Sequence, residues 1–464
     1  MQIPLFEPET KWIAPEVLPD FENAEAIAID LETCDLDLRN SGPGWPWKGG
    51  HVAGVALCFK KGKEFETHYL PIGHQLGQNL DKSLVRSYLQ KLCLTKVPKV
   101  FHNALYDIGW LRTENILKIE GMIFDTMSGA ALLDENRKSY SLDNIGKSWL
   151  SIGKDETLLK EAGAAYSVKN IKQDMWKLPP KFVGPYAEQD TLVTLKLWEY
   201  EKPLLTKDNL DELMELEMSI IPLLIEMRAK GIRVNLDKTQ KTKQDLLTQQ
   251  GELHKELYRK FNVKIDVWAS ASIATAFDTH NLEYPRTQKT GAPSFTKEFL
   301  ENHPHELADN ILRIRKIDKT INTFLDGMIL GSVKNNRIHA ELHPLKSDDG
   351  GAVSGRFSCS RPNLQQASAR DPEFGPMVRK LFLPEKGQQW GALDYSSQEP
   401  RLTVHYAHKT NQPGAGDAVE NYKKDKNMDY HQMVAELAGI SRKHAKTINL
   451  GLAYGMGQVK LCAS

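Results

Sequence analysis

Two short motifs in the first half of the sequence place carboxylates where a divalent cation could lie between them. Asp30 and Glu32 end an apolar run, and residues two apart in a strand share a face, so their like charges point the same way. Asn103 and Asp107 are four residues apart, which puts them on one face of a helix that starts near Asn103. Crowded carboxylates repel each other unless a cation lies between them, and Mg²⁺ prefers oxygen ligands.

A third motif, Tyr186 followed by Asp190, has the same helical spacing on a helix whose other face is apolar. Taken singly, each motif has an ordinary explanation: a solvated strand end, a helix cap beside a surface acid, and a tyrosine at the edge of a core. All three occur in order within one strand-rich segment. That order indicates a common site.

The elements that must position these side chains follow from the apolar pattern. Strand-like runs over residues 26–30, 52–59 and 97–101 alternate with helical stretches, which predicts an α/β domain up to about residue 205. Long amphipathic segments over 210–230 and 306–330 then predict a largely helical region.

Gly231 ends the first of these long helices, and an extended piece over 232–234 follows it. A strand-like run over 337–343 opens a third region that is rich in Gly, Ser and Arg, and helices continue to the last residue.

The overall composition limits the class of partner. Lys and Arg together number 60, as do Asp and Glu, so the net charge is zero and any polyanion must be held by local basic strips. Five scattered cysteines without a CxxC spacing argue against a disulfide framework or a zinc site. No apolar stretch is long enough for a signal or a membrane span, so we expect a cytoplasmic protein without a membrane partner.

Together, the three motifs make residues 20–205 resemble the proofreading 3′–5′ exonuclease domain of family A DNA polymerases, in its tyrosine-containing version. The resemblance implies a ribonuclease H-like fold in which four carboxylates hold two Mg²⁺ about 4 Å apart, with Mn²⁺ as a substitute. These ligands would be Asp30, Glu32, Asp107 and Asp190. Tyr186 would orient the attacking water, and Leu36 and Asn103 would contact the single-stranded DNA 3′ end.

A second group of motifs lies near the end of the sequence. Asp394 follows the apolar Leu393, so we expect it at the end of a strand. The segment from Asp394 to Arg401 looks like the first palm motif of the same polymerase family, in which the aspartate binds both catalytic metals. The resemblance makes Glu399 the acid that crowds the sugar 2′ position of an incoming nucleotide.

Four residues at four-residue steps then form a slowly drifting stripe on one predicted helix: Arg442, Lys446, Leu450 and Tyr454. Taken alone, a cationic solvated helix face explains such a stripe. Beside the palm motif, the segment resembles the fingers helix that binds the deoxynucleoside triphosphate, with Arg442 and Lys446 on its phosphates and Tyr454 against the nascent pair. His431 would contact a further phosphate, and Leu450 departs from the Phe or Tyr usual in the family.

Residues 354–365 resemble the palm segment that touches the minor groove of the primer-template DNA, through Arg356, Asn363 and Gln365. Gly355 would let the backbone approach the DNA closely. Nearby basic residues that could meet phosphates are Lys346, Arg361 and Arg370.

For the whole chain the resemblance predicts an α/β ribonuclease H-like exonuclease domain, a mostly helical thumb, and a partial α+β palm with fingers helices. Their expected bounds are 1–205, 206–335, 336–410 and 411–464. The arrangement is similar to phage-type members, active in a bacterial or phage-infected cell. No His-Asp-Glu turn, the family's last palm motif, follows Asp394, so we expect a complete exonuclease site and a polymerase site that needs a missing C-terminal palm polypeptide.

Three functions stay open at this point. The first is a replicative polymerase with proofreading, and the second is a stand-alone 3′–5′ exonuclease. The third, from another class, is an inactive DNA-binding fragment of a polymerase.

Overall fold

The computed structural model of the chain describes residues 4–262, 264–367 and 371–462. The chain forms two compact units, Met1–Glu385 and Lys386–Ser464, and each is described by itself. The domain bounds expected at residues 205, 335 and 410 stay predictions.

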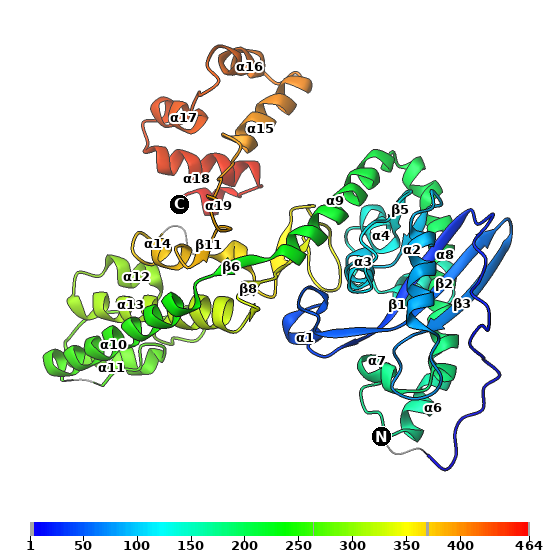
Figure 1. The fold of residues 1–464 in the computed structure, drawn as a ribbon. Coiled ribbons are helices and arrows are strands. Elements are labelled where there is room, and N and C mark those ends of the chain that lie inside the picture. Colours follow the sequence, from blue (N-terminus) through cyan, green and yellow to red (C-terminus); the bar gives the residue numbers. More distant parts are fainter. Residues whose placement is uncertain (1–3, 263, 368–370, 463–464) are drawn as a thin grey trace. The chain divides into compact units, whose positions relative to one another are not determined.

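The first unit begins with a five-stranded mixed sheet whose strand order is β3-β2-β1-β4-β5 (Figure 1). Its strands are β1 (Ala26–Asp35), β2 (Gly50–Lys61), β3 (Glu64–Pro71), β4 (Lys99–Phe101) and β5 (Ile123–Asp125). Strand β1 pairs antiparallel with β2 and parallel with β4. This is the α/β architecture that the apolar runs predict.

The central strand β1 explains why the first predicted motif follows an apolar run. Residues 26–29 of β1 are almost fully buried, and a strand covered on both faces carries a continuous apolar sequence. The pairing register with β2 shifts between Glu32 and Thr33. A bulge of this kind redirects side chains at the end of a strand.

Helices cover the sheet, and the long helix α8 (Pro180–Lys207) packs against β1, β2 and β3. The apolar face expected beyond Tyr186 is buried, with Leu195, Leu197 and Trp198 inside. The other helices of this part are α1 (Leu38–Ser41), α2 (Lys82–Cys93), α3 (Ala104–Thr113), α4 (Thr126–Leu133), α5 (Leu142–Ile145), α6 (Thr157–Ala165) and α7 (Ile171–Asp174). A π-helical turn, η2 (Gly146–Leu150), lies between α5 and α6.

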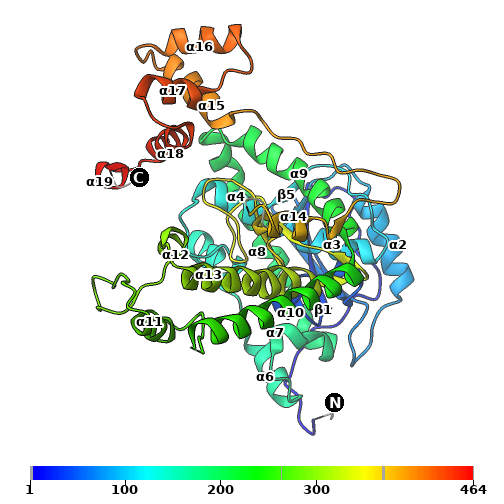
Figure 2. The ribbon, with the colours of Figure 1, turned by 90° about the vertical axis from the view of Figure 1, so that its left-hand side faces the viewer.

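The predicted helical region begins with α9 (Asp211–Lys230), which ends at Gly231 with φ 60, a value that glycine adopts without strain. Next come β6 (Ile232–Val234), α10 (Leu236–Phe261), α11 (Ser270–Thr279), α12 (Lys297–Asn302) and α13 (Glu306–Lys319). The helix expected over 306–330 continues past α13 as a π-helical segment, η4 (Thr320–Leu330). Helices α10 and α13 lie side by side in both views (Figure 1, Figure 2).

Short strands form two small sheets next in this part of the first unit. Strand β6 pairs with β8 (Arg337–Ile338) and with β11 (Phe382–Leu383), and β7 (Val333–Lys334) joins β8. Strand β9 (Glu341–His343) pairs with β10 (Ser358–Ser360) in a second sheet, and α14 (Phe374–Arg379) precedes β11. The strand expected over 337–343 is therefore divided between two sheets.

The second unit consists of helices among its described residues: α15 (Gln398–Lys409), α16 (Ala415–Lys424), α17 (Tyr430–Ala438), α18 (Arg442–Ala453) and α19 (Gln458–Cys462). The expectation that Asp394 ends a strand is wrong, because the segment before α15 forms none. An apolar run becomes a strand only where another strand takes up its backbone hydrogen bonds. Leu393, beside Asp394, is fully exposed.

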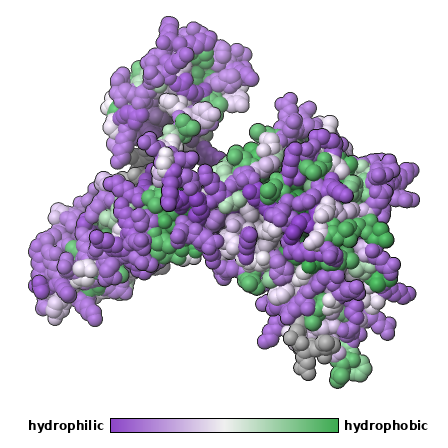
Figure 3. All heavy atoms as spheres, viewed as in Figure 1, coloured by the Kyte–Doolittle hydropathy of each residue, from purple (hydrophilic) through white to green (hydrophobic). Residues whose placement is uncertain are grey.

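All five cysteines are free, as their spacing predicts, and four of them are buried. Within residues 4–262, 264–367 and 371–462, the helices are too short or too polar to cross a bilayer. Hydrophilic residues predominate on the face drawn in Figure 3, with hydrophobic residues scattered among them.

Candidate active site

Carboxylates from three elements of the first unit meet beside β1. Asp30 and Glu32 lie on β1, and Asp107 lies in the first turn of α3. The backbone N–H of Leu31 donates to Oδ1 of Asp107 at 3.1 Å, which fixes α3 to β1 between the first two acids. Asp190 comes from α8, and Glu32, Asp107 and Asp190 are buried.

The pKa values of these carboxylates are raised by burial and by the charges of one another. Burial, followed by the charge of Asp190, raises the pKa of Asp30 to about 7. Burial, followed by the charges of Asp30 and Asp190, raises the pKa of Glu32 well above its ordinary value. Burial and then Asp30 have the same effect on the pKa of Asp107. Four acids are therefore close enough to resist simultaneous ionisation.

The donor set fits a hard divalent cation. Oδ1 of Asp190 is buried without a hydrogen-bond partner, so it is an oxygen with spare ligating capacity. Within the described part of the chain, however, no three His, Cys, Asp or Glu side chains are grouped as a ready metal cage. A lysine lies there instead: Nζ of Lys154 donates to Oδ2 of Asp190 at 2.5 Å.

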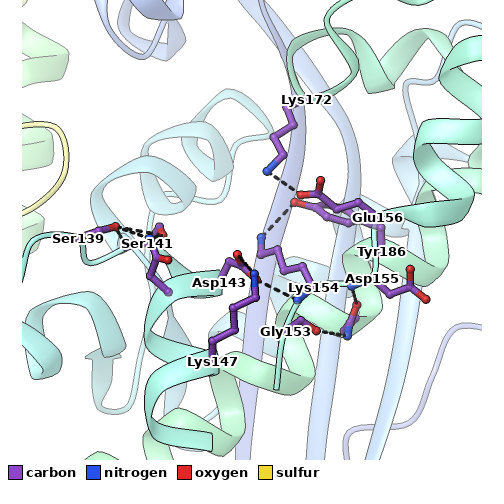
Figure 4. A network of polar contacts seen from close by, with 12 residues as sticks. Ser139, Ser141, Asp143, Lys147, Gly153, Lys154, Asp155, Glu156, Lys172 and Tyr186 are labelled. Carbon is purple, nitrogen blue, oxygen red and sulfur yellow. Dashed lines mark hydrogen bonds and ion pairs between the residues drawn. The ribbon is translucent and has the colours of Figure 1, made fainter. Parts of the chain in front are cut away.

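Tyr186 stands one turn before Asp190 on α8 and is buried. Its hydroxyl oxygen accepts a hydrogen bond from Nζ of Lys154 at 3.0 Å (Figure 4). Burial, followed by the charge of Asp190, raises the pKa of Tyr186 far above its ordinary value. The phenol therefore stays neutral and keeps its proton for donation.

Asn103 stands at the start of α3, as predicted, but its side chain does not cap the helix. The carboxylate of Asp125 does so, since it accepts from the backbone N–H groups of Asn103 at 2.9 Å and Ala104 at 3.1 Å. The Asn103 side chain instead lines a cavity of about 860 Å³, which Gln365 also lines. Leu36, just beyond β1, is 66% exposed.

Asp125 and Lys154 are the residues of this site that the sequence patterns do not reveal. Asp125 follows an apolar run of only three residues, which gives too short a pattern for a strand. Lys154 lies 36 residues from Asp190 in a loop, where neither helical nor strand periodicity places a side chain. No pattern in the sequence therefore identifies Lys154.

The second unit brings two of the later motifs together. The hydroxyl of Tyr454 donates to Oε1 of Glu399 at 3.0 Å, which joins the end of α18 to the first turn of α15. Nε of Arg442 donates to Oδ2 of Asp429 at 2.6 Å, so this arginine is held by a neighbouring carboxylate. The predicted helix over 442–455 is present as α18.

Other predicted residues of the second unit lie apart from those contacts. Asp394 is exposed in the segment before α15, and Lys446 is exposed on α18. Leu450 is half-buried. His431 is buried on α17, where its Nδ1 lies 3.2 Å from Nδ2 of Asn449.

The predicted primer-template segment of the first unit is a folded loop. Oδ1 of Asn363 accepts from the backbone N–H of Gln365 at 3.1 Å, and Nε2 of Gln365 donates to the carbonyl of Phe357 at 3.0 Å. Arg356 is exposed in the same loop. Arg370 lies outside the described residues.

Comparisons with known proteins agree with both groups of motifs. The family model for 3′-5′ exonuclease matches residues 9–205, and the model for DNA polymerase family A matches residues 236–464. The DNA-directed DNA polymerase of Pseudomonas phage M6 is 36% identical over 490 aligned positions, which cover 100% of this chain and 72% of that protein. DNA polymerase DpoZ of Acinetobacter phage SH-Ab 15497 is 29% identical, over 96% of this chain and 72% of its own length.

A solved structure shows the same fold. It is the POL domain of Pol1 from M. smegmatis in complex with DNA primer-template and dNTP, with a TM-score of 0.70 at 21% identity. It covers 93% of this chain, and this chain covers 68% of it. The predicted family is confirmed: the chain belongs to DNA polymerase family A, as a phage-type DNA-directed DNA polymerase with a 3′–5′ exonuclease domain.

Proposed function

We propose that four carboxylates of β1, α3 and α8, three of them buried and that of Asp30 half-buried, form the working proofreading site of this polymerase, which removes nucleotides from a single-stranded DNA 3′ end. The four are Asp30, Glu32, Asp107 and Asp190. The observation that carries the proposal is their convergence in a buried place where one oxygen, Oδ1 of Asp190, has no partner. Such a set of charges is costly in a folded protein unless cations neutralise it.

These carboxylates would hold two Mg²⁺, and Mn²⁺ could replace them, since both are cations that take oxygen ligands. The bound metals would supply an activated water and stabilise charge on the leaving 3′ oxygen. The chain contributes oxygens fixed on a strand and two helices, so little reorganisation is required when the substrate arrives.

Tyr186 would orient the attacking water by donating the proton that its raised pKa preserves. Leu36, which is 66% exposed beside β1, would pack against the terminal base. Asn103 would contact the DNA strand, since its side chain is not used to cap α3.

A 5′-labelled primer-template with Mg²⁺ and no nucleotides tests the site. The wild-type chain should shorten the primer to a ladder, and the double variant Asp30→Ala with Glu32→Ala should leave it intact. Glu22→Ala with Glu64→Ala is the matched control, because it removes two exposed carboxylates of the same domain. Shortening by the first double variant would refute the assignment.

We infer a second, nucleotide-binding site in residues 386–464 for primer extension. Asp394 would bind the catalytic metals, and Glu399 would crowd the sugar 2′ position. The triphosphate and nascent pair would be contacted from α17 and α18 by His431, Arg442, Lys446, Leu450 and Tyr454. The hydrogen bond from Tyr454 to Glu399 supports this inference, because it joins the two motifs across 55 residues of sequence.

The primer-template DNA would be held in part by the loop of Arg356, Asn363 and Gln365. That the M. smegmatis domain was solved with DNA primer-template and dNTP supports both partners. Adding deoxynucleoside triphosphates to the same assay tests the second site. Extension supports a proofreading polymerase, shortening alone supports an exonuclease, and a gel shift without either supports a DNA-binding fragment.

A further inference from the structure

Lys154 reaches into the carboxylate site from the loop between η2 and α6. Its Nζ donates to Oδ2 of Asp190 at 2.5 Å and to the hydroxyl oxygen of Tyr186 at 3.0 Å. It also lies 5.0 Å from the centroid of the Tyr186 ring, and the Lys154 side chain is only 14% exposed. One ammonium group therefore contacts both predicted functional residues of α8.

The loop is fastened so that Lys154 points at α8. The side-chain amide of Gln189, the residue before Asp190, donates to the carbonyl of Gly153 at 3.0 Å and accepts from the N–H of Asp155 at 2.9 Å. On the other side, the backbone N–H of Lys154 donates to Oδ1 of Asp143 at 3.0 Å (Figure 4). Both neighbours of Lys154 are thus tied to the helix that carries Tyr186 and Asp190.

This geometry restricts what the Tyr186 hydroxyl can do. An ammonium group has donors and no acceptor, so in this contact the oxygen of Tyr186 must accept. The proton of Tyr186 then has to point away from Lys154. A tyrosine with a freely rotating hydroxyl would lack this restriction on the direction of its proton.

The same ammonium group also competes for Asp190. A carboxylate oxygen that accepts a charge-assisted hydrogen bond at 2.5 Å is less available to a metal than a free one. The ammonium group is thus a cation already present among the acids. It offsets part of their mutual repulsion.

We propose that Lys154 is a positioning residue of the exonuclease site that fixes the Tyr186 hydroxyl as a donor and acts as the counter-ion of Asp190 until metal binds. This inference rests on the proposed exonuclease function. The proposal gives Lys154 two opposite effects: the residue opposes metal binding, and it favours turnover. A residue that only supported the fold would influence both in the same direction.

Lys154→Met tests the proposal, since it keeps the length of the side chain and removes the charge. We expect Mn²⁺, followed by electron paramagnetic resonance of the free ion without DNA, to bind this variant about 3- to 10-fold more tightly. We expect kcat for primer shortening to fall about 10- to 100-fold with KM for the oligonucleotide unchanged. Lys154→Arg should recover much of kcat, because a guanidinium can donate to both partners.

Lys172→Met is the matched control, because Lys172 carries the same charge nearby but pairs with Glu156 at 2.7 Å and makes neither contact. It should leave kcat within about 2-fold of wild type. Circular dichroism and thermal unfolding verify that each variant is folded. Weaker or unchanged Mn²⁺ binding by Lys154→Met, or a kcat equal to that of Lys172→Met, would overturn the proposal.

Failure of the proposed exonuclease function itself would look different. In that case the wild-type chain would not shorten the primer, and Asp30→Ala with Glu32→Ala would bind Mn²⁺ as well as wild type does. Tighter binding by Lys154→Met with a lowered kcat supports the proposal only where the wild-type chain passes both of these checks.

Discussion

Asp107 accepts a hydrogen bond from the backbone N–H of Leu31 at 3.1 Å, and Leu31 separates Asp30 from Glu32. The bond makes one carboxylate both a predicted metal ligand and the clamp between α3 and β1. Charge and hydrogen-bond acceptance can be separated at this residue, because an asparagine retains the acceptor and loses the charge.

Asp107→Asn should therefore abolish primer shortening, by at least about 100-fold, while leaving the thermal unfolding temperature equal or higher. Asp107→Ala should also be inactive but destabilised by about 1–3 kcal/mol, because the buried N–H of Leu31 loses its partner. Exonuclease assays and denaturant unfolding of the two variants provide the comparison. Equal stability losses in both would mean that the clamp is unimportant.

Metal removal should also affect stability. Burial raises the pKa of Asp30, Glu32 and Asp190, and the charges of neighbouring acids raise the pKa of Asp30 and Glu32 further, so the ionised carboxylates are costly in the metal-free protein. We expect millimolar Mg²⁺ to raise the unfolding temperature of the wild-type chain relative to the same protein in chelator. The double variant Asp30→Ala with Glu32→Ala should lose this increase. An identical Mg²⁺ effect in both proteins would place metal binding elsewhere.

Glu201 should make the stability of the first unit depend on pH. It is fully buried on α8 and neither carboxylate oxygen has a hydrogen-bond partner, and burial, followed by the charge of Asp125, raises its pKa well above the ordinary value. The folded state therefore holds a proton that the unfolded state releases above about pH 4.5. Its contribution to stability is fully present below that pH and is lost as pH rises through the folded pKa.

Glu201→Gln should accordingly raise the unfolding temperature at pH 8 and change it little at pH 4.5. Each unit of pKa shift corresponds to about 1.4 kcal/mol, which is a few degrees in a domain of this size. Glu215→Gln, an exposed glutamate on α9, is the matched control. The explanation fails if Glu201→Gln has the same effect at both pH values.

In the second unit, Arg442→Ala with Lys446→Ala should weaken nucleotide binding. Both cations lie on α18, and charge-assisted contacts to phosphate oxygens are among the stronger hydrogen bonds. We expect the Kd for a deoxynucleoside triphosphate, measured by equilibrium dialysis, to rise at least about 10-fold. Lys443→Ala on the same helix is the control, since Lys443 is exposed and off the predicted stripe. A similar rise with Lys443→Ala would indicate a general effect of charge.

The sequence predicts the parts of the candidate exonuclease site that depend on local periodicity. Asp30 and Glu32 follow from strand alternation in a continuous apolar run, and Tyr186 and Asp190 follow from helical spacing. Contacts made by loops cannot be obtained in this way. Lys154 reaches Asp190 because Gln189 fastens its loop to α8, and no regular spacing encodes that contact.

Pairing between distant strands is the other limit. The apolar residues before Asp394 predict a strand, but a strand requires a partner for its backbone, and the described segment has none. The run over 337–343 is likewise divided, because β8 pairs with β6 and β9 pairs with β10. By contrast, α9 and α18 match their predicted ranges, since a helix satisfies its backbone locally.

The anomalous scattering of Mn²⁺ in a crystal of the wild-type chain tests the central claim most directly. The account predicts two peaks about 4 Å apart, bounded by the carboxylates of Asp30, Glu32, Asp107 and Asp190. Saturating Mn²⁺ with no peak among these four side chains, or with peaks at other carboxylates alone, would contradict it.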